Sequence, residues 1–139
     1  MTAGREGGGA QHAPGKYLLD VNVLLAVIWV GHPEHTKAFA WLSNKTVMLC
    51  PLSELGFLRI STNRKAIGAP MEKARRLLEQ FVADRAAESI TDDLAALDSH
   101  PKRSEEVTDH YLADLVAKHS ARLATFDKAI SHAGVELIA

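Results

Sequence analysis

Four acidic residues of the chain each lie just after a short apolar run or at the start of a helical pattern: Asp20, Glu54, Asp109 and Asp127. Apolar runs with little polar alternation are typical of buried strands in a parallel sheet. Open α/β sheets bind ligands at the carboxyl ends of their strands, and right-handed crossovers bring those ends to one edge. We therefore expect the four carboxylates to converge at one edge of a parallel sheet.

Carboxylates gathered in this way repel one another unless a cation compensates their charge. Two of them about 4 Å apart repel by roughly 4 kcal/mol at an effective dielectric constant near 20. Oxygen ligands, with no Cys or His at metal-ligand spacing, favour a hard ion, Mg²⁺ or Mn²⁺. Such an ion activates water and stabilises the attacking and leaving oxygens when a phosphodiester bond is hydrolysed. The pattern therefore predicts metal-dependent hydrolysis of a phosphodiester.

Each acid also has a simpler explanation when it is taken alone. Asp20 could act only as a helix N-cap, and Asp109 and Asp127 could be early-turn acids that the helix dipole favours. Glu54 could be a solvated helix residue. The agreement of all four positions favours a common site. The other acids near these segments are less suited as ligands: Asp92, Asp93 and Asp114.

The composition is that of one ordinary globular domain. The 139 residues are 47% hydrophobic and 24% charged, with a formal net charge of −1. This charge excludes a strongly basic surface, so a nucleic acid would have to be held by a local basic patch or by metal ions. Cys50 is the single cysteine and is expected to be a buried thiol in a reducing compartment. With no membrane-length apolar run and no secretory signal, we predict a cytoplasmic protein.

Residues 1–15 contain five glycines and almost no large apolar side chain. Such a segment cannot offset its ordering entropy, so we predict a flexible tail. The folded domain is expected to occupy residues 16–139.

Short apolar runs alternate with helical patterns over the rest of the chain. Strands are predicted at residues 17–19, 46–50, 87–90, 122–126 and 135–138. Helices are predicted at residues 21–30, 34–42, 51–62, 71–82, a short segment ending near 97, 109–119 and 127–132. Leu52, Leu55 and Leu58 mark the third helix, and Thr108 is the predicted N-cap of the helix at 109–119. This alternation predicts an α/β fold, a three-layer α/β/α sandwich with a mainly parallel five-stranded sheet.

Four segments carry a resemblance to a known family: Leu-Leu-Asp20-Val-Asn22-Val-Leu, Pro51-Leu-Ser-Glu54-Leu-Gly-Phe-Leu-Arg59, Thr108-Asp109-His-Tyr-Leu-Ala and Ala124-Thr-Phe-Asp127-Lys. They resemble the PIN-domain ribonucleases and, more narrowly, the VapC toxins of bacterial toxin–antitoxin pairs. The motifs occur in the family's order, and the resemblance covers about residues 16–139.

The resemblance implies a Mg²⁺- or Mn²⁺-dependent endoribonuclease. Asp20, Glu54 and Asp109 correspond to the acids that hold the metal, and Asp127 to a fourth, more variable one. Asn22 corresponds to a polar residue that orients the first acid.

Thr108 and Thr125 lie next to acids, where a hydroxyl could position a carboxylate or a water, although an N-cap or a polar strand residue explains them equally well. The basic residues that follow Glu54, namely Arg59, Arg64 and Lys65, could bind RNA phosphates or simply form a solvated face.

The resemblance also implies partners: a cognate antitoxin protein that fills the active-site groove, and a second copy of the toxin in a homodimer. Trp29, Phe39 and Trp41 are expected in the core, with part of their surface available to such a partner.

Three alternatives are considered. A haloacid-dehalogenase-like enzyme would need a second Asp where Asn22 stands, and a receiver domain would need an acid pair before its phosphorylated Asp. A PIN-like binding module without catalysis is compatible with the same fold. The intact acid set of this chain argues against that alternative.

Overall fold

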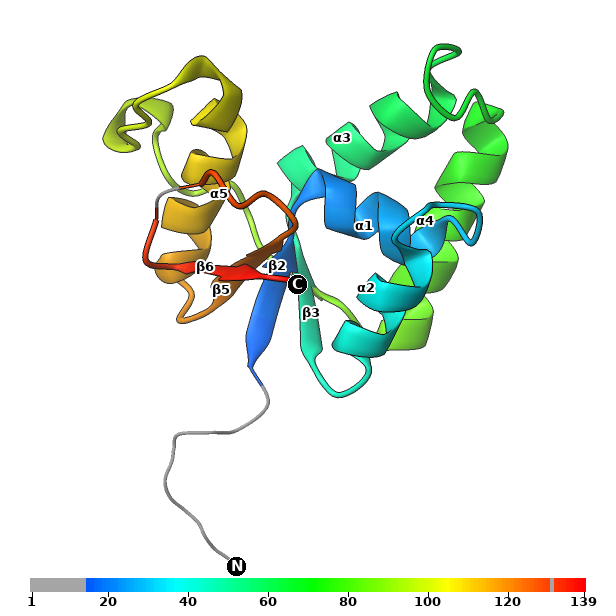
Figure 1. The fold of residues 1–139 in the computed structure, drawn as a ribbon, viewed down its shortest axis with the longest axis horizontal. Helices are drawn as coiled ribbons and strands as arrows, with labels where there is room; N and C mark the ends of the chain where they lie inside the picture. Colours follow the sequence, from blue (N-terminus) through cyan, green and yellow to red (C-terminus); the bar gives the residue numbers. More distant parts are fainter. Residues whose placement is uncertain (1–14, 131) are drawn as a thin grey trace, which may run out of the picture.

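The computed structural model of the chain describes residues 15–130 and 132–139 (Figure 1). The predicted flexible tail at residues 1–15 lies outside the described residues except for Gly15. Within the described part of the chain, no helix combines the length and the apolar character needed to cross a membrane.

The sheet has five strands: β2 (Lys16–Leu19), β3 (Thr46–Leu49), β4 (Glu88–Ser89), β5 (Arg122–Thr125) and β6 (Val135–Leu137). Their order is β4-β3-β2-β5-β6, and all four neighbouring pairs are parallel. The predicted parallel five-stranded sheet is confirmed. The first strand in the sequence forms its centre, so the carboxyl end of β2 lies between those of β3 and β5.

Five α-helices surround the sheet: α1 (Val21–Ile28), α2 (His35–Leu42), α3 (Pro51–Thr62), α4 (Met71–Arg85) and α5 (Val107–Ala117). Two 3₁₀ turns, η1 (Ala96–Asp98) and η2 (Ser104–Glu106), lie between β4 and α5. These elements agree with the predicted helices to within a few residues at most ends. α4 ends at Arg85 and is followed by its C-cap, Ala86, which has a left-handed backbone with a φ of 48°.

Two helix predictions are wrong. α5 begins at Val107 after Glu106, so Thr108 lies in its first turn and is not the N-cap. The predicted helix at residues 127–132 is absent from its described residues, which form turns. The Asp127 carboxylate accepts a hydrogen bond from the backbone N–H of Ala129 (2.8 Å), a local contact that competes with helix formation.

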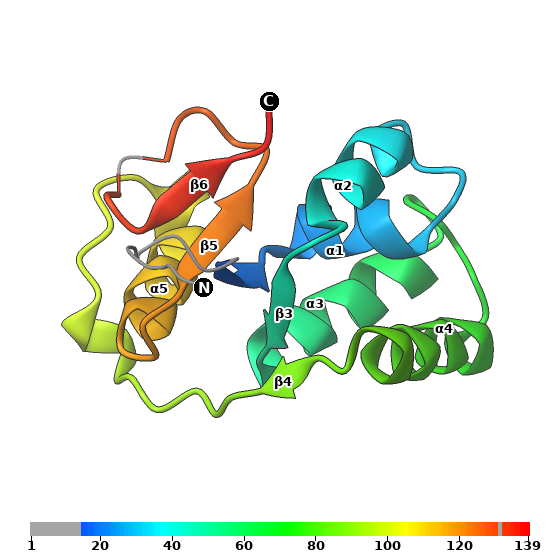
Figure 2. The same cartoon turned by 90° about the horizontal axis from the view of Figure 1, so that it is seen from below.

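Helices cover both faces of the sheet, as Figure 2 shows with α5 on one side and α1 to α4 on the other. The side chains of β2 alternate between the two layers. Tyr17 and Leu19 pack against the larger helical layer, whereas Leu18 packs against α5. Cys50 is a buried free thiol in the α5 layer, as predicted.

The buried face of α3 is not its leucine-rich face. Leu55 is 63% exposed and Leu52 is 37% exposed, while Ser53, Gly56 and Phe57 face the core. Small residues let α3 approach α1 closely, and the leucines are left on the outer face. Leu55 and Leu58 line a groove between α3 and α4.

Gly56 marks the closest approach of α3 to α1, and its replacement by Ala is expected to destabilise the protein. A Cβ at this position would lie 2.6 Å from Cγ2 of Val21. We expect a loss of about 1–3 kcal/mol from overpacking, partly offset by roughly 1 kcal/mol of better helix propensity. Urea unfolding of Gly56→Ala alone and with Val21→Ala measures the effect. If the clash with Val21 is the cause, Gly56→Ala should lower the free energy of unfolding clearly less in the Val21→Ala background than in the unmodified chain.

The aromatic residues divide between core and surface. Trp29 and Trp41 are partly buried against the larger core cluster. Phe39 on α2 is 53% exposed, so it is not the core residue that was expected and belongs to the outer surface.

Candidate active site

Asp20 lies directly after β2 and is only 2% exposed. One carboxylate oxygen, Oδ1, accepts a hydrogen bond from the backbone N–H of Val23 (2.8 Å). The other, Oδ2, accepts a hydrogen bond from the hydroxyl of Thr125 at the end of β5 (2.5 Å). Asp20 is therefore the N-cap of α1, and it is also held from the neighbouring strand.

Burial makes the charged form of Asp20 costly. Desolvation raises the pKa of Asp20 to about 7, although the hydrogen bonds from Thr125 and the backbone lower it, and the charge of Asp109 raises it further. A carboxylate that resists ionisation in the metal-free protein gains most from a nearby cation. The interaction with Asp109 also shows that the two acids share one region.

Asp109 and Asp127 form the second part of this region. Asp109 lies in the first turn of α5, and burial, together with the charge of Asp127, raises its pKa. Asp127 is exposed, and its backbone N–H donates to the hydroxyl of Thr125 (3.0 Å). Thr125 thus contacts Asp20 with its proton and the Asp127 backbone with its oxygen, which fixes the two acids relative to each other.

Glu54 has a different acidic neighbour. It is half-buried in the first turn of α3, and burial, followed by the charge of Asp92, raises its pKa. Asp92, which the sequence analysis ranks below the four predicted acids as a ligand, is exposed in the segment after β4. The rule applied to the other acids, an acid just after a strand, would have selected it. The acidic edge therefore extends from the end of β4 to the start of α5.

Asp109 interacts with both Asp20 and Asp127, and Glu54 interacts with Asp92, but the four predicted acids do not form a tight cluster. Among the described residues, no three of them bring one carboxylate oxygen each within 4.8 Å of one another. Within that same part of the chain, none forms an ion pair with a lysine, arginine or histidine. Asp20, Glu54 and Asp109 are buried or partly buried carboxylates with raised pKa values and no basic partner, and such groups fit a bound divalent cation. Their oxygen-only donor set fits Mg²⁺ or Mn²⁺.

Hydrogen bonds at the start of α3 set the position of the first turn, which carries Glu54. Pro51 occupies the first position of the helix, where its missing N–H is not needed. The backbone N–H of Cys50 donates to the hydroxyl of Ser53 (3.1 Å), and that hydroxyl donates to the Cys50 carbonyl (2.9 Å). The entry of α3 is therefore fixed directly beside the end of β3.

Two of the predicted supporting residues are exposed on the first turns of their helices. Asn22 follows Asp20 on α1, and Thr108 precedes Asp109 on α5. The hydrogen bonds to the Asp20 side chain come from Val23 and Thr125. The roles of Asn22 and Thr108 stay predictions.

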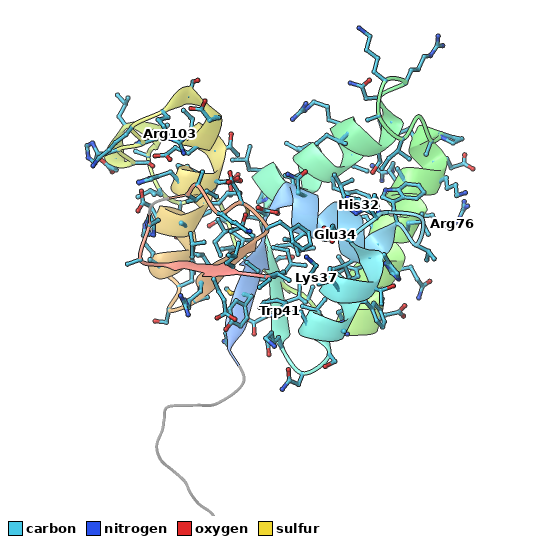
Figure 3. All side chains as sticks on the ribbon, viewed as in Figure 1. His32, Glu34, Lys37, Trp41, Arg76 and Arg103 are labelled. Carbon is cyan, nitrogen blue, oxygen red and sulfur yellow. The ribbon has the colours of Figure 1, made fainter. Side chains whose placement is uncertain are left out.

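The basic residues Arg59, Arg64 and Lys65 lie exposed at the end of α3 and in the segment that follows it. A cation that the sequence reasoning missed lies on α2. Lys37 has its Nζ 5.7 Å from the ring centroid of Phe126, the residue before Asp127, and it points toward the middle of the molecule (Figure 3). No sequence signal links Lys37 to this region, because α2 is far from β5 along the chain.

A parallel α/β sandwich with acids along one edge of the sheet is compatible with several classes of metal-dependent domain, and the family comparison identifies the class. The PIN domain model matches residues 17–136, nearly the whole described chain. The chain therefore belongs to the PIN-domain family.

Individual proteins similar to this chain indicate which branch of the family it resembles. The chain is 33% identical over 121 residues to Ribonuclease VapC38 of Mycobacterium tuberculosis, covering 81% of this chain and 86% of that protein. It is 34% identical over 124 residues to Ribonuclease VapC44 of the same species, covering 82% and 87%. The crystal structure of VapBC2 from Rickettsia felis bound to a DNA fragment from their promoter aligns with a TM-score of 0.58. It has 18% identity and covers 88% of this chain and 98% of that one, which supports the fold.

Proposed function

We propose that this chain is a metal-dependent endoribonuclease that acts as the toxin of a toxin–antitoxin pair. The observation that carries the proposal is the edge of interacting acids without basic partners, from Asp20 to Asp127, in a member of the PIN-domain family. The relatives named Ribonuclease VapC support RNA as the substrate.

Asp20, Glu54 and Asp109 are the residues that would hold the ion, and Asp127 would join them directly or through water. When bound, Mg²⁺ or Mn²⁺ supplies activation of water and stabilisation of negative charge on the reacting phosphate. Thr125 keeps Asp20 in position through its hydroxyl, which donates to Oδ2. In this proposal Asn22 orients Asp20, and the hydroxyl of Thr108 positions a carboxylate or a water.

RNA must approach an edge that is itself acidic, so cations near the edge matter for binding. Arg59, Arg64 and Lys65 are exposed beyond the end of α3 and are proposed to contact phosphates. Lys37 is a further candidate because it lies beside the segment that carries Asp127.

A protein partner is part of the proposal. The VapBC2 structure from Rickettsia felis is a complex of this fold with a second protein, which supports a cognate antitoxin for this chain. Homodimerisation is proposed on the family resemblance. The groove between α3 and α4, with the exposed Leu55 at its rim, is a surface available to either partner.

Cleavage of total RNA by the purified chain tests the proposal. We expect discrete fragments with Mg²⁺ or Mn²⁺, no fragments with a chelator, and a loss of cleavage in Asp109→Asn. Isothermal titration with Mn²⁺ reports metal binding in the same samples. Metal binding without cleavage of any RNA would instead favour a binding module. Cleavage that persists with both the chelator and Asp109→Asn would contradict the assigned site.

Arg103 connects the two segments that carry Asp109 and Asp127, and its removal is expected to loosen the site. Its Nη2 donates to the Ala129 carbonyl (3.0 Å) and to Oε2 of the buried Glu106 (3.1 Å) at the start of α5. Figure 3 shows Arg103 on the α5 side of the molecule. We expect Arg103→Ala to weaken Mn²⁺ binding about 10-fold or more, the usual cost of losing a supporting contact.

The matched control for this variant is Lys102→Ala. Lys102 is the adjacent exposed cation, and its contact with Glu106 is made by its backbone N–H, which the substitution keeps. Equal Mn²⁺ affinities for Arg103→Ala and the unmodified chain would show that the contact does not support the site.

A further inference from the structure

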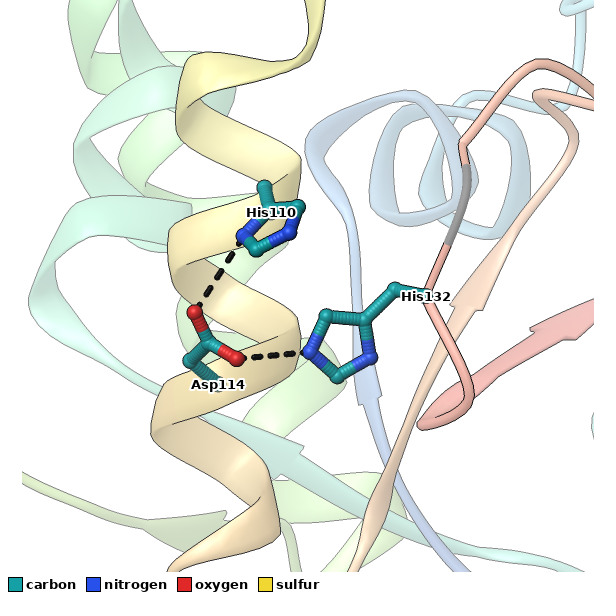
Figure 4. Close-up of side chains that lie close together, drawn as sticks. All are labelled: His110, Asp114 and His132. Carbon is teal, nitrogen blue, oxygen red and sulfur yellow. Dashed lines mark hydrogen bonds and ion pairs between the residues drawn. The ribbon is translucent and has the colours of Figure 1, made fainter. Parts of the chain in front are cut away.

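A second group of polar side chains lies between α5 and the segment before β6, and the proposed nuclease reaction does not use it. His110 and Asp114 are one turn apart on α5, so they share a face of the helix, and His132 projects toward them from the other segment (Figure 4). His110 Nδ1 lies 3.2 Å from Asp114 Oδ2, and His132 Nε2 lies 2.6 Å from Asp114 Oδ1.

Among the described residues, this is the one group of three in which a potential ligand atom from each residue lies within 4.8 Å of the others. The side chains of both histidines are 15% exposed, and that of Asp114 is 28% exposed. The group is therefore largely shielded from water and still reachable by an ion.

We propose that His110, Asp114 and His132 bind a divalent transition-metal ion of the Zn²⁺ type. Two imidazole nitrogens and one carboxylate oxygen are a ligand set that suits Zn²⁺, and three protein ligands leave a fourth position for water. Zinc–ligand bonds of about 2.0–2.2 Å place tetrahedral ligands roughly 3.3 Å apart. The 3.2 Å between His110 Nδ1 and Asp114 Oδ2 matches this spacing, whereas the 2.6 Å between His132 Nε2 and the other oxygen, Oδ1, has to open by roughly 0.7 Å.

The protons on the two imidazoles can rearrange so that the ion binds one nitrogen of each ring. The backbone N–H of Gly134 donates to His132 Nδ1 (2.8 Å), so the proton of the neutral ring lies on Nε2 and points at Asp114. When the ion takes Nε2, that proton moves to Nδ1 and the Gly134 hydrogen bond is lost. The ion likewise takes Nδ1 of His110, whose proton moves to Nε2. The Gly134 hydrogen bond and the two imidazole–Asp114 contacts are thus exchanged for three metal–ligand bonds.

The geometry of the group favours an ion between its members. Both imidazoles contact the one carboxylate of Asp114, from α5 and from the segment before β6. The buried Ser99 hydroxyl lies 3.2 Å from His110 Nδ1 and restricts that ring.

This site is distinct from the acidic edge in place and in chemistry. Asp114 lies five residues after Asp109, about 140° further around α5. The acidic edge offers oxygen ligands only, whereas this group offers two imidazoles. An ion here fixes the segment around His132 to α5, and its binding does not depend on nuclease activity.

Competition titration of Zn²⁺ between the full chain and a fluorescent chelator tests the proposal. The chain carries Asp20→Asn in every sample, which weakens metal binding at the acidic edge, and circular dichroism checks folding. We expect His132→Ala to weaken Zn²⁺ binding at least about 10-fold and to abolish the rise in melting temperature that Zn²⁺ produces. Asp114→Asn, which keeps the size of the side chain, is expected to have the same effect.

The matched control is His119→Ala. His119 is also a partly exposed histidine next to an acid, with its Nε2 3.3 Å from Asp93 Oδ1, but it lies outside the group of three. We expect this variant to bind Zn²⁺ as the parent chain does. Unchanged Zn²⁺ affinity in both His132→Ala and Asp114→Asn, or an equal loss in His119→Ala, would overturn the proposal.

Discussion

Replacing Asp20 with Asn is expected to lower the rate of RNA cleavage by on the order of 1,000-fold and to leave the fold intact. The amide keeps an oxygen to accept from the Val23 N–H, so the cap of α1 survives. It removes the negative charge that would hold the ion, and metal ions contribute several kcal/mol to stabilisation of the transition state. Single-turnover cleavage of RNA in Mn²⁺ measures the loss.

The control for this variant is Asp84→Asn, an exposed acid near the end of α4 that is hydrogen-bonded to Gln80. It makes the same chemical change away from the acidic edge, so its cleavage rate should match that of the unmodified chain. A fully active Asp20→Asn would remove Asp20 from the mechanism and leave the acidic edge without its most buried member.

The stability of the metal-free protein is expected to depend on pH through Asp20, and Asp20→Asn should abolish this dependence. The pKa of Asp20 is about 7 in the folded chain and near 3.8 in the unfolded chain. Because the folded state favours the protonated form, the contribution of this group is fully present below about pH 4. It is lost as the pH rises through 7. The loss amounts to as much as about 4 kcal/mol at pH 8.

Asp20→Asn should therefore be more stable than the unmodified chain at pH 8 when a chelator is present, with the difference shrinking toward pH 4. Urea unfolding at several pH values measures both proteins. Saturating Mn²⁺ should reverse the order at pH 8, because the ion stabilises the unmodified chain by mass action. A difference in stability that does not change with pH would show that burial does not penalise the Asp20 charge.

The predictable part of the fold follows from local patterns. The apolar runs at β2, β3 and β5 have no polar alternation, and buried parallel strands are the structure in which such runs are stable. Capping residues and Pro51 mark helix starts to within a few residues. The prediction failed at residues 127–130, where a side-chain contact of Asp127 with the backbone replaces helical hydrogen bonds.

The buried side of α3 could not be predicted from hydrophobicity. Leu52, Leu55 and Leu58 form the more apolar stripe, yet Gly56 and Phe57 face the core. The choice depends on how closely α1 approaches, since Gly56 lies against Val21 with no room for a side chain. Close packing of two helices is a property of the pair, and neither helix sequence contains it alone.

Local sequence is enough to predict the parallel α/β class and the placement of Asp20, Glu54, Asp109 and Asp127 at helix starts and strand ends. These features depend on residues that are near one another in the chain. The connections between the acids depend instead on contacts between remote segments. Thr125 donates to Asp20 across 105 residues of sequence, and Asp92 lies close enough to Glu54 to raise its pKa. The His110, Asp114 and His132 group arises in the same way, because packing of α5 against the sheet sets the distances between remote segments.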